Sequence, residues 1–393
     1  MITPVMPTYG RWDVAVDHGE GCYLYATDGR KFLDFTSGIA VTALGHCHPS
    51  LIEAVTAQAK KLWHVSNLFQ IPGQQKLAER LVANSFADTV FFNNSGAEAV
   101  ELSLKVARKY QSETGHPERY RVIGCHGSFH GRSFATLAAA GAEAYLKGFG
   151  PVMDGFDHVA FNNLNEMRAA VTNETAAIVV EPVQGEGGVR APSADYLKGL
   201  RAICDEFGLL LVYDEVQCGM GRTGKLFAHE WAGVPPDVMA VAKALGNGFP
   251  IGACLATEKA AVGMVAGSHG STFGGNPMAV AAGNAVLDVM LEPAFFDRVQ
   301  RVSRLLQDRL QTLVGAHPKL FAELRGSGLL LGIRCQPAVT AGDFVAKLRA
   351  EGLLCLTAGE NVLRILPPLV VSDREIEEGM AILNKVALEW PAS

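Results

Sequence analysis

The sequence predicts an α/β protein in which a large domain, built on a mainly parallel central sheet, is joined by a smaller α+β lobe made from both chain ends. Three observations in the 393 residues support this prediction. Short apolar runs alternate with helical patterns through the middle of the chain, some of these runs are apolar without a break, and the pattern changes after about residue 291. Regular alternation of strands and helices is typical of right-handed crossovers in a parallel sheet.

The first 50 residues contain two strand-like segments, 22–26 and 31–35, which flank a turn at Asp28-Gly29. Apolar and aromatic residues on both sides of such a turn are typical of paired strands. We expect these strands to pair with the smaller lobe rather than with the main sheet. Residues 1–50 are therefore expected to form an N-terminal segment that joins this lobe.

Residues 51–290 are expected to form the large domain. Seven segments have the length and apolar content of strands: 89–92, 121–125, 158–161, 176–181, 209–214, 238–242 and 252–257. Uninterrupted apolar runs such as 178–180 and 209–212 fit strands that are buried on both faces, as in a parallel sheet. Helical patterns at 97–110 and 194–207 lie between the strands.

Residues 291–393 are expected to form the C-terminal small domain. A helical, Arg-rich segment at 296–314 is followed by a Gly-rich and apolar stretch at 326–334. Short strand patterns at 353–356 and 362–366 precede a final helix. Such a mixture, without the regular alternation of the preceding residues, is typical of an α+β unit.

The composition excludes several classes of function. The chain has 34 Lys and Arg against 40 Asp and Glu, and this net charge of −6 argues against non-specific nucleic-acid binding, which needs an excess of cations. No run of about 18 apolar residues appears, and the first ten residues do not resemble a signal peptide. We therefore expect neither a membrane span nor secretion.

The eight cysteines are scattered and none forms a Cys-x-x-Cys pair, which indicates reduced thiols in a cytoplasmic protein. The segment His46-Cys47-His48 could suggest a metal site. Adjacent residues do not readily ligate one ion, and no second cluster has zinc-like spacing, so we expect no metal.

A Ser/Gly-containing turn at 94–97 joins a predicted strand to a predicted helix. The first N–H groups of a helix have no internal partner and lie at the positive end of its dipole, so an anion is stabilised there. Gly96 and Ala97 are thus candidates for binding a phosphate. An ordinary N-cap formed by Ser95 explains the same residues equally well.

Acidic and basic residues follow two other predicted strands. Asp214 and Glu215 lie at the carboxyl end of a buried strand, where α/β sheets bind ligands, although one of them could simply cap a turn. Lys243 follows an apolar strand and precedes a Gly-rich turn. Such a lysine usually extends to solvent, but in a pocket it becomes a Schiff-base nucleophile.

The segment 219–224 matches the Gly-x-Gly-x-x-Gly pattern of dinucleotide-binding proteins. In that motif the first Gly follows its strand directly and a helix begins at once. Here five residues intervene and the following segment is too short for the expected helix, which disfavours a nicotinamide or flavin cofactor. A helix N-terminus for a phosphate, a carboxylate for a ring nitrogen and a lysine for an aldehyde are instead the set that pyridoxal 5'-phosphate (PLP) needs.

Several further motifs occur in an order that points to one family. They are Gly38-Ile-Ala-Val41, Gly45-His-Cys-His-Pro49, Asn94-Ser-Gly-Ala-Glu-Ala99, Ser128-Phe-His-Gly-Arg132, Glu181-Pro-Val-Gln-Gly-Glu-Gly-Gly188, Asp214-Glu-Val-Gln-Cys-Gly-Met-Gly-Arg-Thr-Gly224, Lys243 and Ser271-Thr-Phe-Gly-Gly-Asn-Pro277. With them, essentially the whole chain resembles the class-III PLP-dependent aminotransferases of fold type I, and most closely the bacterial acetylornithine aminotransferases. The Gly-x-Gly-x-x-Gly pattern belongs to one of these motifs, which removes the dinucleotide alternative.

The resemblance implies a role for each residue around the cofactor. Lys243 would hold PLP covalently and carry the proton during the reaction, and Asp214 would pair with the ring nitrogen. The other residues implied in cofactor binding are Gly96, Ala97 and Thr272 at the phosphate, Phe129 and Val216 on the ring faces, Gln217 at the ring hydroxyl, and Glu215 as a weaker candidate. Thr272 and Ser271 resemble a segment that reaches across from a partner subunit, so a homodimer with shared sites is expected.

Three charged residues, together with Ser271, are implied in substrate binding. Arg132 resembles the arginine that clamps a carboxylate at the far end of the donor, and Arg364 resembles the one that takes the α-carboxylate of glutamate or 2-oxoglutarate. Glu186 resembles the gatekeeper that pairs with Arg364 when the donor has no second carboxylate. The alternatives are a surface ion pair for Arg364 and a loop-capping role for Arg132.

The reaction that the resemblance implies is ping-pong transfer of the δ-amino group of N2-acetyl-L-ornithine to 2-oxoglutarate, which gives N-acetyl-L-glutamate 5-semialdehyde and L-glutamate in arginine biosynthesis. Ile39 favours an acylated donor, because ornithine aminotransferases have there a tyrosine that reads the free α-amino group. Succinylornithine, ornithine, 4-aminobutyrate and N-succinyl-diaminopimelate stay open as donors, as does a fold-type-I aminomutase. Thr42 and Asn247 stand where the family usually has an asparagine and a glycine.

Overall fold

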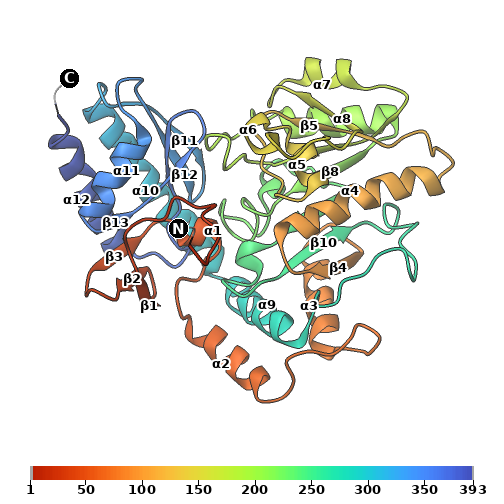
Figure 1. Cartoon of the computed structure of the whole chain (residues 1–393), viewed down its shortest axis with the longest axis horizontal. Coiled ribbons are helices and arrows are strands. Elements are labelled where there is room, and N and C mark those ends of the chain that lie inside the picture. Colours follow the sequence, from red (N-terminus) through yellow and green to blue (C-terminus); the bar gives the residue numbers. More distant parts are fainter. Residues whose placement is uncertain (1–2, 392–393) are drawn as a thin grey trace.

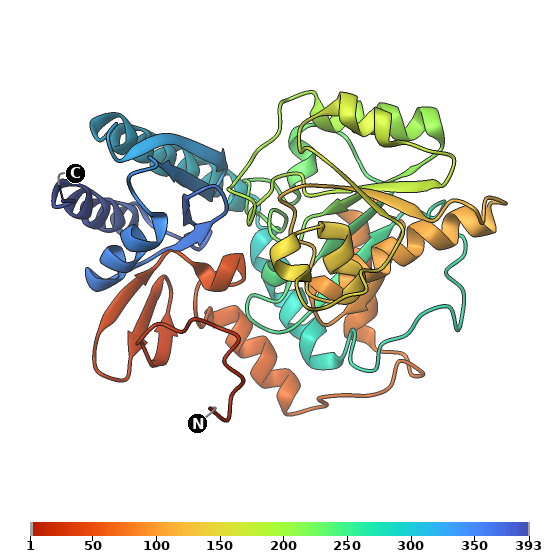
Figure 2. The same ribbon diagram turned by 45° about the horizontal axis from the view of Figure 1, so that its top comes forward.

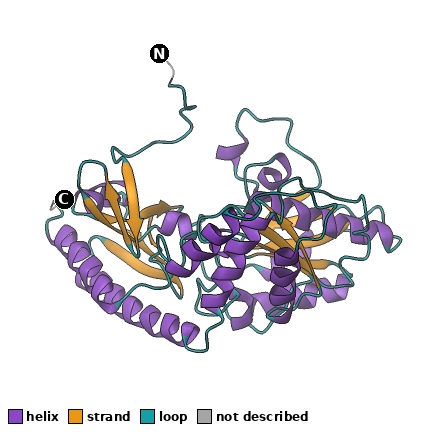
Figure 3. Cartoon of the chain, turned by 90° about the horizontal axis from the view of Figure 1, so that it is seen from below, coloured by secondary structure: helices purple, strands orange, loops and turns teal. Residues whose placement is uncertain are grey.

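The protein folds into two parts that lie side by side, and the smaller part contains strands and helices from both ends of the chain (Figure 1). The structure is a computed structural model that describes residues 3–391. The larger part holds one seven-stranded sheet, and the smaller part holds two four-stranded sheets (Figure 2). Figure 3 shows the strands gathered in two separate groups, one in each part.

The larger part is organised around the seven-stranded sheet. In spatial order its strands are β4 (Thr89–Asn93), β10 (Gly252–Ala256), β9 (Val238–Val241), β8 (Leu210–Asp214), β7 (Thr175–Val180), β5 (Arg121–Cys125) and β6 (Phe156–Val159). From β9 to β6 neighbouring strands are parallel, whereas β10 is antiparallel to both of its neighbours. The predicted mainly parallel sheet is confirmed, with one reversed strand that the sequence pattern did not predict.

The strand predicted at 158–161 is shifted towards the N-terminus, since β6 ends at Val159. The next N–H group, that of Ala160, donates to the Glu166 carboxylate at 2.8 Å. Glu166 lies in the first turn of α7 (Leu164–Ala170), which Asn163 caps. The first turn of α7 thus binds the N–H group that would otherwise have continued the strand.

The central strands are buried on both faces, as their uninterrupted apolar runs predicted. In β8, Leu211 and Tyr213 belong to one hydrophobic cluster, whereas Leu210 and Val212 belong to a second cluster. Successive side chains of a strand point to opposite faces, so the two clusters are core layers on either side of the sheet. Helix α8 (Tyr196–Phe207) contributes to the first cluster and helix α4 (Gly96–Glu113) to the second.

The remaining α-helices of the larger part are α2 (Pro49–Ala59), α3 (Pro72–Ala83), α5 (Phe134–Ala140), α6 (Glu143–Leu146) and α9 (Pro277–Met290). Helix α9 is a core helix that packs against both α2 and α3. No single helix within residues 3–391 is both long and apolar enough to cross a membrane. Helices α9 and α10 (Phe295–Ala316) pass such a test only as a pair, and they are bent by 74° relative to each other.

The smaller part contains two sheets, with the orders β1 (Val16–Glu20), β2 (Tyr23–Ala26), β3 (Lys31–Asp34), β13 (Leu353–Leu354) and β11 (Phe321–Ser327), β12 (Leu330–Cys335), β15 (Val362–Ile365), β14 (Leu356–Ala358). Its helices are α10, α11 (Ala341–Ala350) and α12 (Asp373–Leu388). Strand β3 pairs in parallel with β13, which confirms that the N-terminal strands join the C-terminal lobe. The domain limits at 1–50, 51–290 and 291–393 stay predictions.

Candidate active site

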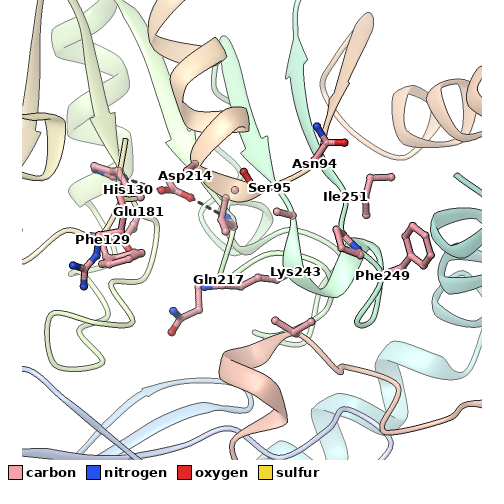
Figure 4. Close-up of a pocket in the computed structure, with 18 of the residues that line it drawn as sticks. Asn94, Ser95, Phe129, His130, Glu181, Asp214, Gln217, Lys243, Phe249 and Ile251 are labelled. Atoms are coloured by element: carbon pink, nitrogen blue, oxygen red, sulfur yellow. Dashed lines mark hydrogen bonds and ion pairs between the residues drawn. The ribbon is translucent and has the colours of Figure 1, made fainter. Parts of the chain in front are cut away.

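A cavity of about 380 Å³ opens at the carboxyl ends of the central strands (Figure 4). Open α/β sheets bind ligands at this edge, and the volume suits a cofactor-sized molecule. Asp214 is the last residue of β8, and Lys243 begins a short 3-10 helix just after β9. Eight residues singled out in the sequence line the cavity: Gly96, Ala97, Phe129, Arg132, Asp214, Val216, Gln217 and Lys243.

The N-terminus of α4 forms one wall of the cavity. Ser95 is its N-cap, and the Ser95 hydroxyl accepts the Glu98 N–H at 3.2 Å. The N–H groups of Gly96 and Ala97 belong to the first turn, where a helix offers no internal acceptor, so they are available to an anion. A Cβ at position 96 would lie 2.6 Å from Val216 Cγ1, so only glycine allows this close approach. Ser95 can therefore cap the helix while the N–H groups of Gly96 and Ala97 bind an anion.

Asp214 is held from two sides inside the cavity wall. Its Oδ2 lies 2.7 Å from His130 Nδ1, and its Oδ1 accepts the Val216 N–H at 3.0 Å. His130 and Asp214 are both almost entirely buried. Burial alone would lower the pKa of His130, but the hydrogen bond and the charge of Asp214 outweigh it and raise that pKa. The two contacts thus fix the orientation of the Asp214 carboxyl group at the base of the cavity.

Glu181 adds a second buried carboxyl to the same wall. It is 4% exposed, and its Oε2 accepts the Phe129 N–H at 3.2 Å. Burial raises the pKa of Glu181 to about 8, with His130 opposing and Asp214 reinforcing the shift. Glu181 therefore carries a proton at neutral pH.

Lys243 extends into the cavity from a backbone in the left-handed region, with φ of 47°. A residue other than glycine adopts this conformation only where its surroundings hold it, and such residues gather at functional sites. Desolvation in the cavity lowers the pKa of Lys243 to about 8, while Asp214 raises it and Arg364 lowers it further. A lysine with a pKa near neutrality keeps part of its amine uncharged, as a nucleophile or a proton carrier requires.

Arg364 lies beside the cavity on β15 and joins residues of the two parts. It is 2% exposed, its Nη2 lies 2.9 Å from Glu186 Oε2, and its Nη1 donates to Gln217 Oε1 at 3.2 Å. Among the described residues, its Nε has no hydrogen-bond partner. The Glu186 side chain is 35% exposed, so it can leave Arg364 more readily than Gln217 can. The surface ion-pair alternative for Arg364 does not fit this burial.

Arg132 lies at the other side of the cavity, after the loop that carries Phe129. Its guanidinium carbon is 3.8 Å from the ring centroid of Tyr145 and 5.5 Å from that of Phe129. Cation–π contacts of this kind orient a guanidinium without using its hydrogen-bond donors. Arg132 is exposed, and it stays free to bind a carboxylate.

Comparison with known proteins identifies the family. The model of the family "Aminotransferase class-III" matches residues 6–387. The chain belongs to the class-III aminotransferases. Relatives named acetylornithine aminotransferase include one from Bradyrhizobium diazoefficiens, 57% identical over 97% of this chain and 94% of the relative, and one from Mesorhizobium japonicum, 56% identical over 95% and 93%.

Solved structures of aminotransferases have the same fold. The ornithine aminotransferase from Toxoplasma gondii superposes with a TM-score of 0.94 at 32% identity, over 98% of this chain and 92% of that one. The N-acetylornithine aminotransferase from Stenotrophomonas maltophilia gives a TM-score of 0.85 at 39% identity, over 97% of both chains. The predicted fold type I is confirmed.

This aminotransferase depends on PLP, as its family does. The cavity residues fit that cofactor. The free N–H groups of α4 suit its phosphate, the carboxylate of Asp214 suits a protonated ring nitrogen, and Lys243 is the amine within the same cavity.

Other residues singled out in the sequence lie outside the cavity. The Glu215 carboxylate accepts the N–H groups of Ala228 at 2.6 Å and His229 at 2.9 Å, and it lies 2.7 Å from His229 Nδ1. The Glu215 side chain thus holds the loop that follows it, and a role for Glu215 in binding the cofactor stays a prediction. Ser271 and Thr272 line a separate hollow on the surface of the larger part.

Three residues of the site had no role in the sequence analysis. His130 and Glu181 stand inside motifs that were recognised, but only the fold shows that they contact Asp214 and Phe129. Tyr145 lies in the short helix α6, whose sequence carries no signal for a contact with Arg132.

Proposed function

We propose that this aminotransferase transfers the δ-amino group of N2-acetyl-L-ornithine to 2-oxoglutarate, giving N-acetyl-L-glutamate 5-semialdehyde and L-glutamate in arginine biosynthesis. The observation that carries this proposal is the pair Arg364–Glu186, at 2.9 Å beside the cavity. The exposed Glu186 carboxylate can pair with Arg364 or leave it free. This suits an enzyme that binds first a substrate with one carboxylate and then a substrate with two. The names of the close relatives support the same activity.

The residues around the cofactor have the following proposed roles. PLP, when bound, supplies an electron-accepting ring that stabilises the charge left when the substrate carbon loses a proton. Gly96 and Ala97 would bind its phosphate, and Asp214, held by His130, would pair with the ring nitrogen. Lys243 would hold the cofactor, and its Nζ would accept and return the proton during the transfer.

The ring itself is proposed to lie between Phe129 and Val216, with its hydroxyl bound by Gln217. All three residues line the cavity. Gln217 is already fixed, since its Oε1 accepts from Arg364. A Cβ at Gly185 would lie 1.9 Å from Gln217 Oε1, so the glycine makes room for this side chain.

Two arginines are proposed to sort the substrates. Arg132 binds the carboxylate of the acylated donor, with its guanidinium oriented by Tyr145. Glu186 covers Arg364 while this donor is bound, and the second carboxylate of 2-oxoglutarate then replaces Glu186. The exposed, apolar side chain of Ile39 offers no acceptor for a free α-amino group, which favours an acylated amine.

We further propose a homodimer in which Ser271 and Thr272 complete the partner subunit's site, with Thr272 on the phosphate. The position of both residues outside their own chain's cavity supports this. Asn67 Nδ2 donates to the Ser271 and Gly274 carbonyls at 3.1 Å and 3.0 Å, so two exposed segments lie together. They carry large exposed apolar side chains, as buried interfaces do: Leu62, Trp63, Leu68, Phe69 and Phe273.

A cytoplasmic location is also proposed, and the thiols support it. All eight cysteines are free, and only Cys47 is exposed. Disulfides are rare where the surroundings are reducing.

Rates of glutamate formation with different donors test the activity. We expect N2-acetyl-L-ornithine to exceed ornithine, succinylornithine, 4-aminobutyrate and N-succinyl-diaminopimelate in kcat/KM by about tenfold or more, which is about 1.4 kcal/mol of transition-state preference. A better rate with any of the others would overturn the proposed donor and leave the cofactor and Lys243 in place. Turnover without 2-oxoglutarate would instead favour an aminomutase.

A further inference from the structure

Asn247 forms a bridge between two segments that are distant in the sequence. The Leu44 N–H donates to Asn247 Oδ1 at 2.7 Å, and Asn247 Nδ2 donates to the Gly45 carbonyl at 3.1 Å. The side chain is 5% exposed, so neither bond competes with bulk water. One amide thus uses both its acceptor and its donor on adjacent peptide groups.

The backbone of Asn247 is in the left-handed region, with φ of 46°. Asparagine tolerates this conformation better than most residues, but glycine adopts it freely. The bridge is therefore kept at some backbone cost, at a position where a glycine would be easier to accommodate. Such a cost indicates that the side chain contributes something that the turn alone does not need.

The segment that Asn247 binds, residues 36–45, runs from the smaller part along the cavity. Near its start the Ser37 hydroxyl donates to the Leu366 carbonyl at 2.5 Å, and further on the Ala43 carbonyl accepts the Leu369 N–H at 2.6 Å. Val41, in the middle of the segment, lines the cavity. The segment is thus fixed to the smaller part by Leu366 and Leu369, and to the larger part by Asn247.

The turn α1 (Ser37–Ala40) within this segment is also strained. Ser37, Gly38, Ile39 and Ala40 all have positive φ, between 46° and 67°. Three of these four residues are not glycine, so this left-handed turn needs outside support to persist. Loss of one of its anchors is therefore expected to move the turn, and Val41 and Ile39 with it.

The other departure from the usual motif, Thr42, lies near Gly248, the residue that follows Asn247. Thr42 Cγ2 lies 3.9 Å from the position that a Cβ at Gly248 would occupy. The Thr42 hydroxyl is buried without a hydrogen-bond partner among the described residues, so it does not form the bridge. The amide at position 247 is the group that connects the two segments here.

We propose that Asn247 is a positioning residue that holds Val41 and Ile39 against the donor substrate. It acts through the segment 36–45 and does not itself reach the cavity lining. The turn that carries Lys243 has its own backbone bonds, from Leu245 N–H to the Ala242 carbonyl and from Gly246 N–H to the Lys243 carbonyl. The geometry of Lys243 therefore does not depend on the Asn247 side chain. The proposal rests on the proposed use of Ile39 at the donor end.

Asn247→Gly removes both hydrogen bonds and suits the backbone conformation, so the holoenzyme is expected to fold with a melting temperature close to that of the wild type. In this variant, we expect the Leu44 amide hydrogen to exchange about tenfold faster or more, as after the loss of one buried hydrogen bond. We expect the KM for the donor to rise by about fivefold or more, while kcat and the KM for the acceptor change less than about twofold.

Asn361→Gly is a matched control. Asn361 also has positive φ, 60°, and its side chain also accepts one N–H, from Ala341 at 2.8 Å. Its Nδ2 donates to the carbonyls of Val339 at 2.8 Å and Gln336 at 3.4 Å. It lies outside the cavity lining, and its side-chain hydrogen bonds go to residues 336–341. This variant is expected to leave Leu44 exchange and the donor KM unchanged.

The proposal is overturned if Leu44 exchange is the same in Asn247→Gly as in the wild type, or if the donor KM rises equally in Asn361→Gly. It is also overturned if the KM values for both substrates rise together. Asn247→Asp, which keeps the acceptor but not the donor, provides a second variant, and an unchanged donor KM in it contradicts the proposal. The best donor of the wild-type enzyme is used throughout, so rejection of acetylornithine would overturn the proposed function without deciding the role of Asn247.

Discussion

His130 Nδ1 lies 2.7 Å from Asp214 Oδ2, and both side chains are almost completely buried. The other oxygen of Asp214 accepts the Val216 N–H, so the carboxylate cannot rotate freely. Asp214 in turn raises the pKa of His130 against the effect of burial. The pair therefore fixes a carboxyl group at the base of the cavity, where the cofactor ring is proposed to lie.

Asp214→Asn keeps the size of the side chain and removes its charge. We expect kcat for glutamate formation to fall by about 100-fold or more, the scale of a lost charge-assisted interaction. Asp237→Asn is the control, because the Asp237 carboxylate lies 2.7 Å from Arg201 and is outside the cavity lining. Steady-state rates at saturating substrates give both values, and a loss below about fivefold in Asp214→Asn would contradict the proposed role of its charge.

Glu181 makes the stability of the apoenzyme depend on pH. Its pKa is raised from 4.5 to about 8 by burial, so between these values the unfolded chain loses a proton that the folded chain keeps. The contribution of this group is fully present below about pH 4.5 and is lost as pH rises through 8. In Glu181→Gln, the fall in unfolding free energy between pH 5 and 8 should be smaller by about 1 kcal/mol or more. Urea unfolding at the two pH values measures this difference in unfolding free energy. If the free energy falls equally between pH 5 and 8 in both proteins, Glu181 is not protonated in the folded state.

Glu186→Gln keeps the shape of the side chain that pairs with Arg364 and removes its charge. Arg364 then loses its carboxylate partner, so substrates that bring a second carboxylate should bind better. We expect the ratio of kcat/KM for glutamate to that for acetylornithine, measured as donors in single turnovers, to rise by about tenfold. Arg364→Lys should shift the same ratio in the opposite direction, and an unchanged ratio in both variants would exclude the gate.

Arg132 and Tyr145 are expected to act together on the donor. Arg132→Lys loses the two-pronged carboxylate contact and should raise the donor KM by about tenfold or more. Tyr145→Leu removes the cation–π contact with Arg132 and the edge-to-face contact with Phe129. A rise of about two- to fivefold is expected, since cation–π contacts at exposed sites are worth about 0.5–1 kcal/mol. The double variant tests the coupling, because independent effects would multiply whereas coupled effects fall short of the product.

The sequence predicted the main sheet because burial on both faces leaves a pattern that is local. The apolar run in β8 divides between the two core layers, and this division was visible before the structure. The antiparallel direction of β10 was not predicted, because strand direction depends on the path of the connections and not on the composition of a strand. The end of β6 was misplaced because the Glu166 carboxylate, in the first turn of α7, takes the Ala160 N–H that would have continued the strand.

The site was predictable where neighbouring residues suffice and not where distant ones meet. Asp214 and Glu215 looked equivalent in the sequence, but successive side chains of a strand point in opposite directions. One carboxylate therefore faces the cavity and the other binds the loop at 228–229. The contact between His130 and Asp214 joins residues 84 positions apart, and no local pattern encodes such a pair.

The most direct test of the proposed activity is a two-step absorbance experiment on the purified holoenzyme without an acceptor. We predict that one equivalent of N2-acetyl-L-ornithine removes the yellow absorbance of the bound cofactor, and that 2-oxoglutarate added afterwards restores it with one equivalent of glutamate released. In Lys243→Ala, the donor and the acceptor should not produce this loss and return of absorbance, and no glutamate should be released. Absorbance that acetylornithine leaves unchanged, while ornithine or 4-aminobutyrate removes it, would contradict the proposed donor, and glutamate release by Lys243→Ala at the wild-type rate would contradict the role of the lysine.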